Sequence, residues 1–514
     1  MSTTSRLISG SAASWAQIAV TLASQIALVP IYLSHWNIVM YGTWLAVQAM
    51  SGMVATLDFG HQEYLGFEFL RIGQNNKREL SKHVWSGVSV GIIISLLQVL
   101  LVVILFVTGL LPGLLAKADT VDSVLMRDAG LVLILQGIGY LLCASVTGLL
   151  FRALSPFGYY PRMAWWTLGG SIVTSLVPLI AVVSGAKILV TGAVSVIASL
   201  VYSLPMYADL YRLMKKEKIP FCKPSLKIGW QNFLHSLAIS GKWFLENARQ
   251  QGVRLVLAPL AGAVGLTAFS TMRTGANVAL QGLNTVVYPL MPELMRFMHQ
   301  RDQPKMESAF GTVWFVLVAA LAPAMVVVQA FIEPLYLLWT RGRVTFNPSL
   351  FAMLSLSVLI YAVAQPAIAV VKGNNLLKPQ LLLSIIAAVV VVGGIYILVP
   401  HTGLLGSGMA LVIAESIAAI GYQAYARRWL NQNGLLWPKN HFVIAITSIL
   451  IASIAMGCLI VFPQNKWTIL VLAFLALGGN LWRYWQALPE LATQHASNII
   501  KRLPGMQKLY AISK

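Results

Sequence analysis

Apolar runs of about twenty residues or more recur from one end of this sequence to the other. Each is long enough to cross a hydrocarbon core of about 30 Å, and in a bilayer such a run must fold as a helix to satisfy its own backbone hydrogen bonds. The sequence therefore predicts fourteen membrane-spanning helices, at residues 8–33, 37–58, 84–112, 129–151, 163–184, 188–209, 229–258, 263–292, 308–338, 349–371, 380–400, 403–424, 441–462 and 467–486.

Composition agrees with an all-α polytopic membrane protein. Of the 514 residues, 58% are hydrophobic and 10% are charged, and the mean hydropathy is +0.75. No stretch between the runs is large enough for a separate soluble domain. The first run lacks a small-residue cleavage site, so we expect it to be retained as a helix.

The basic residues are spread through short loops. If the N-terminus is cytoplasmic, 26 of the 36 Lys and Arg residues fall in inside segments and 6 in outside segments. This asymmetry predicts that both termini are cytoplasmic, and it explains the net charge of +20 without a nucleic-acid partner. The three cysteines (Cys143, Cys222 and Cys458) lie far apart with no CxxC spacing, which argues against a metal site, a redox pair or a disulfide framework.

The predicted helices form two similar sets of six. Segments 28–60 and 256–284 each combine a proline near a helix end, a short loop and a second helix that contains polar residues. The repeat predicts an N-lobe at 1–210, a basic cytoplasmic connector at 211–228, a C-lobe at 229–425, and two further helices with a basic cytoplasmic tail at 426–514. Repeats with the same orientation imply a cleft between lobes, and such clefts are usually transport paths.

The seventh and eighth predicted helices carry charges inside the membrane. One stripe of the seventh contains Lys242, Glu246 and Arg249, and a second contains Asn247, Gln251 and Arg254. The eighth helix has a polar arc made of Ser270, Arg273, Asn277, Gln281 and Asn284.

Three or four cations against one carboxylate favour a water-filled site for an anion, since an uncompensated charge in a bilayer is costly. The alternative is that Glu246 forms internal salt bridges with Lys242 or Arg249. One such pair would leave most of the positive charge uncompensated.

Other polar residues lie in the remaining predicted helices. The first helix has a neutral stripe that includes Gln17, and the second has a looser one with Gln48 and Asp58 that ends at the cytoplasmic edge. These residues either line a substrate surface or hold neighbouring helices together. Glu246, Glu415 and Asp58 are candidates for coupling to H⁺ or Na⁺, although for Glu415 a satisfied hydrogen bond to a neighbouring helix is the favoured explanation.

Enzyme motifs and cofactor sites are missing from the sequence. It contains no Walker A, HExxH, GxSxG or paired-carboxylate motif, and no nucleotide-binding domain. We therefore expect neither an enzyme nor a primary pump, and no bound metal or cofactor. A polysaccharide polymerase or ligase of the envelope is the alternative from a different class, and it would need a large extracytoplasmic loop.

The segment "LVPIYLSHWNIVMYGTWLAVQAMSGMVATLDFG", with its "YGTW" and "LDFG", and the segment "FSTMRTGANVALQGLNTVVYPLMPELMRF", with its "RTGAN" and "PEL", carry a family resemblance. The chain resembles the O-antigen (Wzx-type) flippases, the polysaccharide branch of the multidrug/oligosaccharidyl-lipid/polysaccharide (MOP) exporter superfamily, over residues 1 to about 425.

The resemblance implies a MATE-like fold, with two six-helix lobes in a V, in the bacterial inner membrane. It implies export of an undecaprenyl-pyrophosphate-linked oligosaccharide to the periplasmic leaflet, with membrane lipids and the polymerase and chain-length proteins of the same pathway as partners. The positions that match a pyrophosphate site are Lys242, Arg249, Arg254 and Arg273.

Two related functions remain open. Two extra terminal helices also occur in lipid II flippases, so that function is a close alternative. A net positive cavity would repel the substrates of multidrug cation exporters.

Overall fold

The structure, a computed structural model, describes residues 3–117 and 122–488, and these fold entirely into helices and short connections. No strand occurs within these ranges, in agreement with the predicted all-α class. The first half contains α1 (Thr3–His35), α2 (Ile38–Val54), α3 (Thr56–Ile72), α4 (Lys77–Val107), α5 (Leu111–Leu115), α6 (Ser123–Tyr140), the π-helical turn η2 (Leu141–Ser145), α7 (Val146–Ala153), the 3-10 turn η3 (Ser155–Phe157), α8 (Tyr160–Val183), α9 (Ile188–Lys216) and α10 (Leu226–Gln250). The second half contains α11 (Gly252–His299), α12 (Gln303–Val316), the π-helical turn η4 (Leu317–Leu321), α13 (Ala322–Trp339), α14 (Pro348–Gly373), α15 (Leu377–Thr402), α16 (Leu405–Gln432), α17 (Lys439–Val461), the 3-10 turn η5 (Pro463–Asn465) and α18 (Lys466–Ala487).

These helices account for the predicted spans, except that the second, predicted to end at residue 58, continues beyond a bend as α3 to Ile72. Among the described residues, eleven helical stretches have the length and apolar character to cross a membrane, or twelve if α2 and α3, which meet at a bend of 41°, count as one span. The stretch Leu226–Leu283 has 58 residues, or roughly 87 Å at 1.5 Å per residue, which is nearly three core thicknesses. It therefore holds two spans, divided at Gly262, whose φ of 69° and ψ of 178° only glycine adopts readily. With α18, which completes the last hairpin, the total reaches the predicted fourteen.

Side-chain caps set where several helices begin. The Asn37 carboxamide oxygen accepts from the Met40 N–H at 2.8 Å, and the Asp122 carboxylate accepts from the Val124 N–H at 2.9 Å. Such caps satisfy amides that would otherwise lack a partner at the start of a helix. The same role is played at the starts of α4, α10, α12 and α14 by Asn76, Ser225, Asp302 and Asn347.

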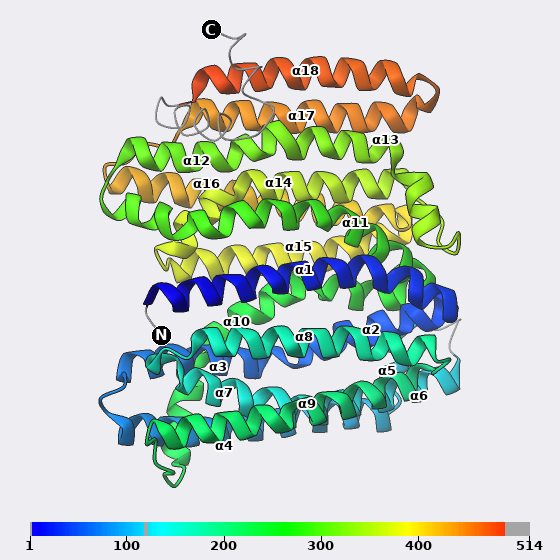
Figure 1. Cartoon of the computed structure of the whole chain (residues 1–514). Helices are drawn as coiled ribbons and strands as arrows, with labels where there is room; N and C mark the ends of the chain where they lie inside the picture. The colour runs from blue at the N-terminus through cyan, green and yellow to red at the C-terminus, as the bar shows by residue number, and fades with distance from the viewer. Residues whose placement is uncertain (1–2, 118–121, 489–514) are drawn as a thin grey trace. The chain divides into compact units, whose positions relative to one another are not determined.

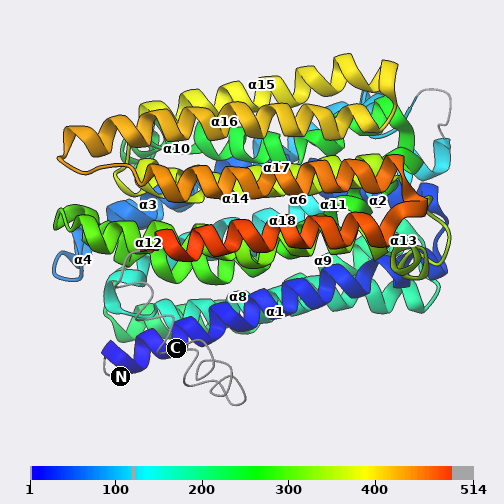
Figure 2. The same ribbon diagram turned by 90° about the horizontal axis from the view of Figure 1, so that it is seen from above.

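Contacts divide the chain into two compact units. Unit 1 comprises Met1–Thr271, Leu337–Thr345 and Ile395–Gly403, and unit 2 comprises Met272–Tyr336, Phe346–Gly394 and Leu404–Lys514. Within unit 1, α1 lies along α8, as Figure 2 shows, and α10 packs against both α3 and α4. Leu65, Phe69, Leu80 and Leu149 are fully buried in its core.

In unit 2 the last two helices are firmly attached. Figure 1 shows α17 and α18 side by side, and Asn480 Nδ2 of α18 donates to Ser448 Oγ of α17 at 2.7 Å. Tyr484 is fully buried, and its hydroxyl donates to the Gly311 carbonyl of α12 at 2.7 Å. Trp314 of α12 in turn donates to the Val363 carbonyl of α14 at 2.9 Å. The two helices after residue 425 are therefore an integral part of this unit.

The predicted lobes, 1–210 and 229–425, concern a sequence repeat and stay a prediction. The two compact units are defined by contacts, which is a different property from a sequence repeat. By contacts, α10, which begins the predicted C-lobe, belongs to unit 1.

Candidate functional site

A row of polar contacts fastens α10 along α3. Ser240 Oγ donates to the Leu57 carbonyl at 3.2 Å, and Ser236 Oγ lies 3.5 Å from His61 Nδ1. Gly60 permits this close approach, because a Cβ at that position would lie 2.3 Å from the Ser240 Cα. Small and hydroxylated side chains are what close helix pairs in membranes use. The face of the seventh predicted span that carries Ser236 and Ser240 is thus a helix–helix contact.

Asn247, which we predicted to line a cavity, takes part in the same contact between helices. Its Nδ2 donates to Thr56 Oγ1 at 3.0 Å, and Thr56 Oγ1 donates to the Gly52 carbonyl at 3.1 Å. One turn earlier, the Trp243 indole donates to the Glu63 carboxylate. Asn247 therefore ties α10 to the bend between α2 and α3, and its role as a cavity residue stays a prediction.

Arg254, in the first turn of α11, is a cation with little compensation. Its Nη1 donates to Gln251 Oε1 at 3.2 Å, while its Nε is buried and has no hydrogen-bond partner among the described residues. Within the same part of the chain, no carboxylate forms an ion pair with it. A buried guanidinium with no acid is costly, so this group is suited to meet an anion.

An aromatic cluster reaches Arg254 through Tyr41. Tyr41 lies near enough to Arg254 to interact with it electrostatically. The Tyr41 ring stacks on Tyr32 with centroids 5.4 Å apart, and Tyr32 contacts Trp36 at 4.9 Å. Gln251 lies beside Gly52, since a Cβ on Gly52 would be 3.9 Å from the Gln251 side chain. Bulky, rigid rings on one side of a cation keep water away and strengthen its attraction for an anion.

Two of the three side chains of the charged stripe of α10 lie within the described residues. Lys242 and Glu246 are half-buried, and no ion pair joins these two side chains in the described structure, although Glu246 does make an interaction. The backbone of Arg249 lies in α10, but its side chain lies outside the described residues. The alternative of an internal salt bridge between Glu246 and Lys242 or Arg249 therefore stays open, because the Arg249 side chain lies outside the described residues.

The polar arc of the eighth span lies on α11 beyond Gly262. Ser270 is buried, and Arg273, Asn277 and Gln281 are half-buried. Their spacing of three and four residues places them along one side of the helix. Ser270 and Arg273 both make interactions. The side chain of Asn284 lies outside the described residues, and the placement of Arg249 and Arg273 on facing walls of one cavity stays a prediction.

Asp58 is the most fully enclosed of the predicted site residues. Its side chain is completely buried at the start of α3, and its Oδ2 accepts from Gln62 Nε2 at 2.7 Å and from the Tyr140 hydroxyl at 3.0 Å. Arg152 Nη1 donates to Gln62 Oε1 at 2.8 Å, so Gln62 connects the carboxylate to a guanidinium. This buried cluster, the Asp58 network, consists of Asp58, Gln62, Tyr140, Ser145 and Arg152.

The second carboxylate oxygen of Asp58, Oδ1, has fewer hydrogen-bond donors than Oδ2. Among the described residues, Asp58 Oδ1 and the Ser145 hydroxyl are buried without a hydrogen bond of standard geometry, but the two groups lie close enough to interact with each other. They face the same spot, because a Cβ on Gly91 would lie 3.3 Å from each. An ionised carboxylate is more costly to bury in this way than a neutral carboxyl group. One oxygen of Asp58 thus has two donors and the other has none of standard geometry, and a role of Asp58 in ion coupling stays a prediction.

Tyr140 directly precedes the π-helical turn η2, and Ser145 is its last residue. Such turns inside α-helices are frequent at functional sites, because the extra residue redirects side chains and loosens the hydrogen-bond ladder. Sequence reasoning missed Gln62, Tyr140, Ser145 and Arg152. The spacing of Asp58 and Gln62 on one helix was a signal, but the other three come from a distant segment, and Arg152 resembled an ordinary basic loop residue.

The remaining predicted residues have simpler surroundings. Gln17 Nε2 donates to Ser171 Oγ at 2.6 Å and links α1 to α8. Gln48 is half-buried in α2, and Glu415 is half-buried in α16 with an interaction of its own. Within residues 3–117 and 122–488, no group of three or more His, Cys, Asp or Glu side chains is arranged to hold a metal ion.

Comparison with solved structures places the fold. A multidrug resistance MATE family transporter of the MOP superfamily, in an inward-facing conformation, matches with a TM-score of 0.62 at 16% identity, over 81% of this chain and 95% of that chain. The lipid II flippase MurJ, in an inward closed conformation, matches with a TM-score of 0.61 at 13% identity, over 93% of this chain and 99% of that chain. This chain has a MATE-like fold.

A third match is a MOP superfamily transporter from Pyrococcus furiosus, described as having a binding pocket of reverse polarity. It has a TM-score of 0.52 and 16% identity, over 84% of this chain and 96% of that chain. No family model and no curated protein matches the sequence. The structural matches confirm the predicted MATE-like, all-α architecture. At these identities they concern the fold alone.

Proposed function

We propose that the chain is a MOP-type exporter that moves an undecaprenyl-pyrophosphate-linked oligosaccharide from the cytoplasmic to the periplasmic leaflet by alternating access. The fold supports a transporter, since the matched proteins are transporters and a flippase. The bacterial inner membrane, the cytoplasmic termini and the partner polymerase and chain-length proteins stay predictions that accompany this proposal.

Arg254 is the observation that carries the proposal. It is a partly buried guanidinium in a membrane helix, hydrogen-bonded to a neutral amide and unpaired with any described carboxylate. Guanidinium groups bind pyrophosphate oxygens with paired hydrogen bonds, and they do so more strongly where water is scarce. Lys242, Arg249 and Arg273 are proposed as the further cations of this site.

The Asp58 network is proposed as the coupling site, with a proton as the ion. Gln62 turns its nitrogen, not its oxygen, toward Asp58. Arg152 lies close enough to interact electrostatically with Asp58, and also with Tyr140 and Glu63. A metal cation would need several oxygen ligands and would be repelled by this guanidinium. Proton uptake at Asp58 changes the charge of the network without any such requirement.

A lipid II flippase is the second candidate. The matched lipid II flippase covers 93% of this chain, whereas the MATE transporter covers 81%. The difference is similar in size to the terminal region that holds α17 and α18. This observation supports a two-helix extension in common, and leaves the sugar part of the substrate as the point to test.

An envelope polymerase or ligase has less support. The connection after α4, where the longest outside loop is expected, contains the short helix α5 and leads into α6 at Ser123. Cysteine accessibility labelling of that loop tests this alternative, because a periplasmic loop of tens of residues would contradict the transporter arrangement.

Binding of undecaprenyl pyrophosphate to the purified full chain tests the anion site. We expect Arg254→Ala to weaken binding by roughly 10- to 100-fold, the range for losing a hydrogen bond to a charged group. Arg254→Lys should recover part of the loss. Arg296→Ala is the control, since Arg296 is also an arginine of α11, beyond the break at Gly262, but is exposed and paired with Glu293. Equal affinities of wild type and Arg254→Ala would refute the proposal.

Flipping assays in proteoliposomes then separate the two candidates. Undecaprenyl-pyrophosphate oligosaccharide and lipid II are supplied separately to the same preparation. Transport of lipid II alone would favour the second candidate over the first.

A further inference from the structure

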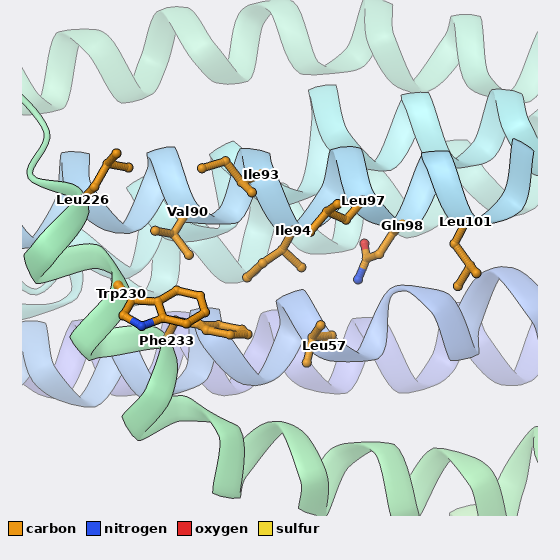
Figure 3. A pocket seen from close by; sticks show the side chains of 10 residues that line it. All are labelled: Leu57, Val90, Ile93, Ile94, Leu97, Gln98, Leu101, Leu226, Trp230 and Phe233. Atoms are coloured by element: carbon orange, nitrogen blue, oxygen red, sulfur yellow. The ribbon is translucent and has the colours of Figure 1, made fainter. Parts of the chain in front are cut away.

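An apolar groove of about 450 Å³ runs along α4 in unit 1, between α4, α10 and α3, as Figure 3 shows. Val90, Ile94, Leu97 and Leu101 of α4 form one wall, and Trp230 and Phe233 of α10 form part of the other. The described walls contain a single polar side chain, Gln98. Nothing in the proposed transport mechanism uses this groove.

The groove lies on a face of unit 1 where large apolar side chains are uncovered. Leu97 is 59% exposed, Leu101 is 50% exposed and Trp230 is 57% exposed. In a membrane-spanning helix, such a surface contacts lipid chains instead of water. A hollow in this surface therefore accepts a hydrocarbon chain more readily than any polar ligand.

The length of the groove matches one leaflet. From Val90 to Leu101 the α4 wall rises by roughly 17 Å at 1.5 Å per residue, which is about half of the hydrocarbon core. An acyl chain of a phospholipid extends over this depth. A polyprenyl chain is much longer and would leave most of its length outside.

Cations stand at one end of the groove. Leu226, which lines it, lies between Lys223 and Lys227, and both lysines are exposed and make no ion pair with the described residues. This end is at the basic connector, where lysines attract anionic lipid headgroups.

The connector is held in place against α4. The Ser225 N–H donates to Ser86 Oγ at 2.9 Å, and the Phe221 ring lies 4.7 Å from the Trp85 ring. The Ser81 hydroxyl donates to the Pro220 carbonyl. These contacts keep the lysine-bearing segment beside the groove entrance, so that a headgroup and a chain are recognised together.

We propose that this groove binds one acyl chain of an anionic phospholipid, with the phosphate at Lys223 and Lys227. On the predicted orientation the lipid belongs to the cytoplasmic leaflet. Because neither Arg254 nor any residue of the Asp58 network lines the groove, the inference does not depend on the proposed function.

Native mass spectrometry of the full chain, titrated with dioleoylphosphatidylglycerol or dioleoylphosphatidylcholine, tests the proposal. We expect Leu97→Trp, which fills the groove, to lower the affinity for phosphatidylglycerol by about tenfold. Leu96→Trp is the matched control, because Leu96 is also on α4, is 51% exposed and does not line the groove. Equal affinities of the two variants would overturn the proposal.

The headgroup is tested separately. We expect the double variant Lys223→Gln, Lys227→Gln to lose the preference for phosphatidylglycerol over phosphatidylcholine, while Lys378→Gln, an exposed lysine of unit 2, keeps it. A preference unchanged in the double variant would overturn the headgroup assignment. Displacement of the bound phosphatidylglycerol by one equivalent of undecaprenyl phosphate would overturn the acyl-chain assignment and identify a polyprenyl occupant.

A measurement that leaves the α4 wall of the groove unaltered covers the case in which Leu97→Trp fails to fold. Phosphatidylglycerol with dibrominated acyl chains quenches tryptophan fluorescence on contact. We expect the quenched fraction to fall in Trp230→Phe and to stay unchanged in Trp467→Phe, whose side chain is 69% exposed on unit 2. Equal quenching in both variants would contradict occupation of the groove.

Discussion

Replacing Gly60 by alanine tests the contact between α3 and α10. The new Cβ would lie 2.3 Å from the Ser240 Cα and 2.6 Å from its backbone nitrogen, so backbone atoms must move and α10 must shift away from α3. Overpacking of this kind costs about 1–3 kcal/mol, while glycine to alanine inside a helix gains about 0.5–1 kcal/mol. We expect a net loss of stability of about 1–2 kcal/mol.

Gly52→Ala is the matched control for this substitution. Gly52 lies inside α2, and a Cβ there meets only the Gln251 side chain at 3.9 Å. This variant should be more stable than wild type by about 0.5–1 kcal/mol.

Thermal unfolding of the purified full chain, followed by size-exclusion chromatography, measures both substitutions. Export should also fall in Gly60→Ala, since a shifted α10 stretches the Asn247–Thr56 hydrogen bond of 3.0 Å. If Gly60→Ala unfolds at the same temperature as Gly52→Ala, the close contact is not the constraint we infer.

Three further predictions concern the charged groups. Asp58→Asn should leave binding of undecaprenyl pyrophosphate within about twofold of wild type. It should remove the dependence of export on a pH gradient, because an amide takes up no proton in this range. Retained gradient dependence in proteoliposomes would contradict the coupling role. The double variant Arg249→Ala, Arg273→Ala should abolish polymer export with normal membrane abundance, and lysine at either position should restore it only in part, since lysine lacks the planar donor group; wild-type export from the stable double variant would rule out the anion site. Glu246→Gln should change turnover or ion coupling more than substrate binding, and a binding defect as large as that of Arg254→Ala would show that our assignment of Glu246 is wrong.

The sequence by itself determined the helices. Span positions follow from the length of each apolar run, and starts follow from local caps such as Asn37 and Ser225, so both depend on neighbours within a few residues. The division of Leu226–Leu283 into two spans was also predictable, because Pro259 and Gly262 interrupt the run before residue 263. Local chemistry decides these features, and the structure agrees with them.

Only the tertiary structure decided which polar residues meet. Tyr140 lies 82 positions from Asp58 in the sequence, and Arg152 lies 90 positions from Gln62, yet all four form one buried cluster. Asn247 and Thr56 are 191 positions apart, so periodicity assigned Asn247 to a helix face without revealing what that face contacts. Periodicity specifies the direction of a side chain from its own helix axis. Its partner is decided by which helices pack together and by how closely glycines such as Gly60 and Gly91 let them approach.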